Sequence, residues 1–202
     1  SSTHDWDSLS DDEKRFHAKR MAVYAGMVDA MDHHIGRLVA HLKTTGRYDN
    51  TIFIFSSDNG SEATGGDNPR SLLSRLGLKM QGYRDDYETL GTKGIFNTIG
   101  PSYASAASSP LAFYKFYAGE GGMRVPLIIA GKPISNKAKL SNAFTFVTDI
   151  TPTILELTST PAPTEFYGGR RIAPMIGRSL AALSREQVAQ VYTEADYIGY
   201  EL

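Results

Sequence analysis

The stretch "TIFIFSSDNGSE", residues 51–62, contains both a predicted strand and candidate metal ligands. Its first seven residues are β-branched, aromatic or small without alternation, which predicts a strand covered on both faces. Asp58 and Asn59 follow, and Gly60 suits a sharp turn. A carboxylate and an amide carbonyl are oxygen ligands that calcium or magnesium prefers. Asp-Asn-Gly also forms plain turns for conformational reasons, so a metal site and a simple turn are both open interpretations.

A long amphipathic helix is expected before this strand. "SDDE", residues 10–13, has the spacing of a capping box, and Gly46 suits a C-terminal cap. Apolar residues recur at helical spacing: Tyr24, Val28, Met31, Ile35, Leu38 and Leu42. This pattern predicts a helix over about residues 11–44. Helix, short loop and buried strand in succession predict an α/β fold with a mixed, mostly parallel sheet flanked by helices, incomplete in this chain. Ligands of such sheets bind beyond the carboxyl ends of strands.

Residues 62–109 are expected to be mostly irregular. Loops of this length are usually functional or disordered, and the aromatic residues here favour a folded excursion over a pocket. The candidates for lining an aromatic pocket are Tyr83, Tyr87, Phe96 and Tyr103.

Lys115 is the second candidate site residue. It lies in "FYKFY", within a short strand expected over 111–117. Its ammonium either reaches the surface along its apolar stem or faces an anion such as sulfate or phosphate. The "EGGMRVP" stretch, residues 120–126, follows. Its glycine pair either lets backbone approach a ligand or forms a tight connection with Arg124 in a structural ion pair.

The rest of the chain is expected to form short strands and helices. "VPLIIAG" predicts a strand with Pro126 near its start, and "DITPTILEL" predicts a helix. Asp149 or Thr151 would be the N-cap of that helix and Pro152 its first residue. Residues 184–202 are expected to begin a C-terminal region, with a short helix near 184–190 and a strand after it.

Composition excludes several classes of function. The 21 basic and 22 acidic residues nearly cancel, so no charge pattern indicates a nucleic-acid partner. No apolar run approaches the length of a membrane span. The absence of cysteine excludes disulfides, thiolate metal sites and a cysteine nucleophile within these residues. The histidines are interpreted as solvated rather than metal-binding: His4, His17, His33, His34 and His41.

Four stretches together resemble a known family: residues 24–62, 113–131, 144–158 and the "GRSL" of 177–180. Their order and spacing are similar to the C-terminal half of the catalytic domain of sulfatases, in the alkaline-phosphatase-like superfamily. Bacterial arylsulfatases are the most similar group. Residues 1–202 are therefore expected to be part of a sulfatase catalytic domain, with 62–108 the least typical part.

The resemblance implies a formylglycine-dependent hydrolase of small-molecule sulfate esters with one bound calcium ion (Ca2+). Asp58 and Asn59 match the calcium ligands, and Lys115 matches the lysine that contacts the sulfate group. The other ligands and the formylglycine nucleophile are expected outside this chain, so the isolated chain is expected to be inactive.

Two alternatives stay open. Phosphatases and phosphonate monoester hydrolases of the same superfamily more often have Asp-His-Gly, so Asn59 favours a sulfatase. The chain by itself is alternatively a catalytically silent fragment or binding module.

Overall fold

The computed structural model describes residues 3–64, 72–84, 86–134 and 140–184. The chain divides into two compact units. The first comprises Ser1–Gly46 and Phe55–Ile128, and the second comprises Arg47–Ile54 and Ile129–Leu202. Within the described ranges, no helix combines the length and apolar character needed to cross a membrane.

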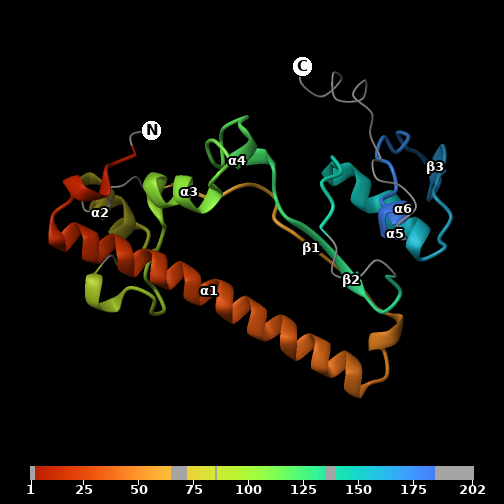
Figure 1. The fold of residues 1–202 in the computed structure, drawn as a ribbon, viewed down its shortest axis with the longest axis horizontal. Coiled ribbons are helices and arrows are strands. Elements are labelled where there is room, and N and C mark those ends of the chain that lie inside the picture. Colours follow the sequence, from red (N-terminus) through yellow and green to blue (C-terminus); the bar gives the residue numbers. More distant parts are fainter. Residues whose placement is uncertain (1–2, 65–71, 85, 135–139, 185–202) are drawn as a thin grey trace. The chain divides into compact units, whose positions relative to one another are not determined.

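The first unit is organised on α1, Asp11–Thr44, which has the predicted bounds (Figure 1). The predicted capping box is present, because Ser10 N donates to Glu13 Oε2 at 3.0 Å and Glu13 N donates to Ser10 Oγ at 3.4 Å. Gly46 follows the helix with a φ of 69°, a conformation that glycine adopts without strain. The helix and both of its end signals are confirmed.

The N-terminal part of α1 carries its buried contacts. Phe16, His17 and Arg20 are buried, and the Arg20 Nε atom donates to the Thr98 carbonyl. His17 lies 3.4 Å from the Arg20 guanidinium. The prediction that this histidine is solvated is therefore wrong, because this turn of α1 packs against the segment that contains Thr98. Most of the predicted apolar face is exposed farther along the helix: Tyr24, Val28, Met31, Ile35 and Leu38.

Short elements complete the first unit. Residues 62–109 are expected to be mostly irregular, but they contain two nine-residue helices, α2 and α3. The sequence did not predict α3 because its small residues give only a weak apolar periodicity. A small core joins Ile99, Ala104 and Tyr114. The elements of this unit besides α1 are η1 (Trp6–Ser8), α2 (Leu72–Met80), η3 (Tyr87–Thr89), α3 (Gly100–Ser108) and α4 (Glu120–Met123).

Strands β1 (Ile52–Ser56) and β2 (Leu127–Gly131) pair as a two-stranded sheet (Figure 1). Gly60 N donates to Gly122 O beyond one end of the pair, and Gly131 approaches Thr51 O at the other. Residue numbers therefore rise along β1 as they fall along β2, and the strands are antiparallel. β1 is half-buried to exposed rather than covered on both faces. Within the described ranges, β2 is its one hydrogen-bonded strand.

Just past β1, the chain crosses the first turn of α4 at very short range. Gly60 N donates to Gly122 O at 2.8 Å. A Cβ atom on Gly60 would lie 1.8 Å from Gly121 O, well inside van der Waals contact. Gly121 and Gly122 are themselves buried against the carbonyls of the preceding loop. The glycine pair thus serves an approach of backbone to backbone.

In the second unit, one buried carboxylate organises the described part. Asp149 Oδ2 accepts from Phe146 N and Oδ1 accepts from Arg178 N, each at 2.8 Å. Thr153 joins the same cluster through the Asp149 carbonyl and Leu180 N. These contacts fasten the "GRSL" segment to the start of α5.

The elements of the second unit are short. The 149–157 helix is confirmed, and Asp149, one of the two N-caps predicted, is its N-cap. Pro152 is its third residue rather than its first. The expected helix near 184–190 lies outside the described residues beyond Ser184, as does the strand after it. The bounds are η2 (Tyr48–Asn50), η4 (Val147–Asp149), α5 (Ile150–Leu157), the antiparallel pair β3 (Phe166–Tyr167) and β4 (Arg170–Arg171), and α6 (Ala181–Ser184).

Replacing Gly60 with alanine is expected to lower the free energy of unfolding by about 3 kcal/mol, because backbone must move to admit the Cβ atom. Gly36→Ala is the matched control, because nothing lies within 4 Å of its Cβ position in α1. That control should stabilise by roughly 0.5–1 kcal/mol through helix propensity. Urea unfolding of the protein measures both, and equal effects would contradict the close crossing.

Replacing Asp149 with alanine is expected to cost about 3 kcal/mol, since two backbone N–H groups lose their acceptor. Asp49→Ala is its control, because Asp49 pairs with Lys132 on the surface, where both side chains are more than half exposed. Its removal should cost less than about 1 kcal/mol. Thermal melting distinguishes the two variants, and a small shift for Asp149→Ala would show that the cluster is not structural.

Candidate functional site

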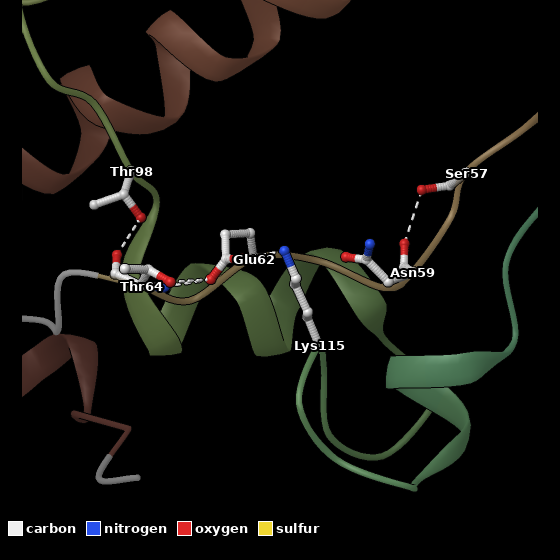
Figure 2. A network of polar contacts seen from close by, with 6 residues as sticks. All are labelled: Ser57, Asn59, Glu62, Thr64, Thr98 and Lys115. Carbon is white, nitrogen blue, oxygen red and sulfur yellow. Dashed lines mark hydrogen bonds and ion pairs between the residues drawn. The ribbon is translucent and has the colours of Figure 1, made fainter.

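The strand-end motif forms a bend directly after β1. Ser57 Oγ donates to Asn59 O at 2.7 Å and closes the bend (Figure 2). Asp58 is exposed and Asn59 is half-buried. Neither side chain forms a hydrogen bond or ion pair with another residue of the described ranges. Because β1 ends at Ser56, the adjacent oxygen ligands Asp58 and Asn59 are not held to opposite faces of a sheet.

The segment that carries Lys115 is a series of turns, so the strand predicted over 111–117 is wrong. Phe113 and Phe116 have φ values of 68° and 78°. Such angles cost of order 1–3 kcal/mol for a bulky residue and persist only where the surroundings impose them. Gly121 N donates to Ala112 O at 2.7 Å, and Lys115 N donates to Ser61 O at 3.0 Å. The first bond closes the loop of residues 112–121, and the second holds this lysine loop against the strand-end segment, residues 57–62.

The Lys115 ammonium is engaged by an acidic neighbour. Its Nζ atom lies 2.7 Å from Glu62 Oε2, with the two side chains 33% and 39% exposed. The hydrogen bond to Glu62 raises the pKa of Lys115 against the opposing effect of desolvation, and the negative charge of Asp58 adds to it. The lysine therefore stays cationic next to the oxygen atoms of the strand-end motif.

Glu62 responds in the opposite sense. Its partial burial alone would raise the pKa of the carboxyl group, but hydrogen bonds from Lys115 and Thr64 outweigh burial and lower it. The two shifts agree, since each group favours the charged form of its partner. Figure 2 shows the Lys115 side chain extending toward the segment that carries Asn59 and Glu62.

Sequence analysis did not identify Glu62. It lies in the same "DNGSE" motif, four residues after Asp58. The available signal was an acidic residue beside a metal-like motif, but its partner Lys115 lies 53 residues away along the chain. Only the folded loop brings the two together.

The donors present fit part of a calcium site. Asp58 and Asn59 offer a carboxylate and an amide oxygen, which is the donor chemistry that calcium requires. Within the described ranges, no group of three or more histidine, aspartate or glutamate residues could hold a metal ion. Since calcium takes six to eight oxygen ligands, these two residues account for a minority of a complete set.

The aromatic candidates of 62–109 make separate contacts within the described ranges. Tyr83 contacts Phe96 with ring centroids 5.9 Å apart, whereas Tyr103 packs on Trp6 at 6.2 Å. Tyr87 lies under the Lys19 ammonium at 4.3 Å. That these four residues line one aromatic pocket stays a prediction.

Arg124 forms the ion pair that was one of its two interpretations. Its guanidinium lies 3.6 Å from Glu120, and both side chains are about two-thirds exposed. An exposed pair at this distance contributes little to stability.

Comparison with known proteins identifies the family. Residues 2–160 match the family model described as Sulfatase. An uncharacterized sulfatase of Schizosaccharomyces pombe is 37% identical over 99% of this chain, which covers 36% of that relative. An arylsulfatase of Klebsiella aerogenes is 32% identical over 89% of this chain and 38% of its own length. A multifunctional alkaline phosphatase superfamily protein of Trinickia caryophylli is 26% identical over 62% of this chain and 25% of its own length.

The chain thus spans little more than a third of the first two relatives. The α/β fold class predicted from the sequence is confirmed, since the alkaline-phosphatase-like fold of sulfatase domains is of this class. With a family match over residues 2–160 and the strand-end and lysine segments adjacent in the first unit, the chain belongs to the sulfatase family.

Proposed function

We propose that this chain supplies part of the active site of a sulfuric ester hydrolase that cleaves small-molecule sulfate monoesters. The observation that carries the proposal is the hydrogen bond from Lys115 N to Ser61 O, 3.0 Å long. It brings Lys115 to the same part of the first unit as Asp58 and Asn59, which lie more than 50 residues earlier and whose side chains have no hydrogen-bond or ion-pair partner in the described ranges. Membership of the sulfatase family supports the reaction class.

The residues of this chain have distinct roles in the proposal. Lys115 binds a sulfate oxygen and counters its negative charge, as a preorganised donor does in a site of low dielectric constant. Asp58 and Asn59 hold a calcium ion, together with ligands outside this chain. When bound, that ion supplies further positive charge for the sulfate oxygens. Gly60 holds the bend that carries the two ligands against α4, through its hydrogen bond to Gly122 O.

The nucleophile is expected outside these residues. The 202 residues contain no cysteine and no Ser-x-Pro-x-Arg segment, the two precursors that the family implies for a formylglycine. The proposal therefore assigns this chain charge stabilisation and metal binding, but not the covalent step. In isolation the chain would be catalytically silent.

A phosphatase or phosphonate monoester hydrolase is the second candidate. The similarity to the multifunctional alkaline phosphatase superfamily protein favours it. Phosphate monoesters carry more negative charge than sulfate monoesters, so a second metal ion would suit them better. Asn59 offers an amide oxygen where a histidine would bind such an ion, which favours the sulfatase.

Hydrolysis of chromogenic esters tests the reaction class. The full-length protein is expected to cleave 4-nitrophenyl sulfate with a higher kcat/KM than 4-nitrophenyl phosphate, because its site carries a single calcium ion. The isolated 202-residue chain should release no 4-nitrophenol from either ester. A preference for the phosphate ester would favour the second candidate, and turnover by the isolated chain would contradict the position of the nucleophile.

Calcium dependence tests the ligand assignment. Removing the metal with a chelator should abolish 4-nitrophenyl sulfate hydrolysis and lower the melting temperature, and added calcium should restore both, since ligand binding stabilises the folded state. Asp58→Ala should weaken calcium binding, measured by titration calorimetry, and abolish turnover. Ser61→Ala is the matched control, because only its backbone carbonyl is used in the site. Unchanged calcium affinity in Asp58→Ala would leave the motif a plain turn.

A further inference from the structure

Glu62 has no role in the function proposed above, yet it holds the candidate sulfate-binding lysine. We propose that Glu62 is a positioning residue that fixes the Lys115 ammonium in the orientation needed to receive a sulfate oxygen. This inference rests on the proposed function and concerns how the same site is built.

The contact between the two side chains is short and partly shielded. Glu62 Oε2 lies 2.7 Å from Lys115 Nζ. A lysine ammonium has three N–H donors, so this bond leaves two for a ligand. Lysine has the flexible stem and high rotamer entropy that make an unsupported ammonium a poorly oriented donor. The carboxylate restricts that freedom before a ligand arrives.

The carboxylate is itself held in place. Its Oε1 atom accepts hydrogen bonds from both Thr64 N, at 2.7 Å, and the Thr64 hydroxyl. The Thr98 hydroxyl donates in turn to the Thr64 carbonyl (Figure 2). The Thr98 carbonyl accepts from Arg20, which is buried in α1. A continuous series of hydrogen bonds therefore links the ammonium to the main helix of the unit.

The lysine is attached at both of its ends to one short segment. Its backbone N–H donates to Ser61 O, and its ammonium pairs with Glu62 one residue later. Because residues 58–62 also carry the two candidate calcium ligands, the spacing between ammonium and metal ligands is set within five residues. A surface ion pair without this second attachment would not fix that spacing.

The charge balance is consistent with this role. The hydrogen bond to Glu62 raises the pKa of Lys115 despite desolvation, so the ammonium keeps its charge. Exposed ion pairs contribute little to folding, so removing Glu62 should alter the site more than the melting temperature.

The first test is steady-state kinetics of the full-length protein with 4-nitrophenyl sulfate. Glu62→Ala is expected to lower kcat/KM about 100-fold through misplacement of the ammonium. Glu62→Gln keeps an acceptor oxygen without the charge, so partial rescue to about a tenfold loss is expected. Thr64→Val removes one of the bonds to Glu62 and should give a smaller loss in the same direction. Asp49→Asn, which breaks the surface pair with Lys132, should leave kcat/KM unchanged.

The second test needs no activity. Acetic anhydride labelling of the folded protein, followed by mass spectrometry, measures the reactivity of Lys115 against that of Lys132. Glu62→Ala and Glu62→Gln should increase labelling of Lys115 about threefold, because loss of the carboxylate lowers the pKa of the ammonium and so increases the share of reactive free amine. Asp49→Asn should affect Lys132 alone.

The two tests separate the two proposals. A wild-type protein without sulfatase activity would overturn the proposed function, while labelling would still decide whether Glu62 controls Lys115. Unchanged Lys115 labelling in the Glu62 variants would overturn the positioning role, even where activity falls. If Glu62→Ala does not fold, Glu62→Gln and Thr64→Val decide by the same criteria.

Discussion

The crossing of Gly60 over the backbone of Gly121 and Gly122 is the constraint on which the candidate site depends. Two main chains meet there with no room for a Cβ atom, and Gly60 N bonds to Gly122 O. The end of β1 and the lysine loop consequently share one location. A Cβ atom at residue 60 would force one of the two backbones to shift. Glycine is thus required at these positions because the two backbones lie so close together. Its effect on the candidate site is indirect, through the positions of the neighbouring side chains.

Backbone strain near this crossing lies in the lysine loop, whereas the hydrogen-bond partners that hold the loop come partly from the strand-end segment. The loop before α4 contains two phenylalanines at positive φ, and it is secured by backbone hydrogen bonds to its own glycines and to Ser61. The strand-end segment supplies the acidic partner and the acceptor. Local distortion at one segment is therefore balanced by hydrogen bonding from another, a distribution common at functional sites.

Local sequence signals predicted much of this arrangement. The capping box, helical spacing and terminal glycine of α1 act within a few residues, so the helix was predicted at its observed bounds. Asp58 and Asn59 were placed correctly at a strand end for the same reason. Their role as calcium ligands remains a prediction. The family resemblance, carried by four stretches in order, is confirmed by the match over residues 2–160.

Features decided by tertiary contacts escaped prediction. An aromatic run resembled a strand at 111–117, but glycine packing forces turns there. His17 is buried because its helical turn meets a segment some 80 residues later. The partnership of Glu62 with Lys115 is likewise non-local. Helix α3 was missed because small side chains give little periodicity.

The exposed apolar stripe of α1 has a consequence for handling the chain by itself. Its apolar side chains repeat at alternating steps of three and four residues along several turns and remain in contact with water. Exposed apolar surface of this kind promotes association between molecules. Salts that strengthen the hydrophobic effect should increase it. The isolated chain would therefore self-associate, and its hydrodynamic radius would increase with protein concentration.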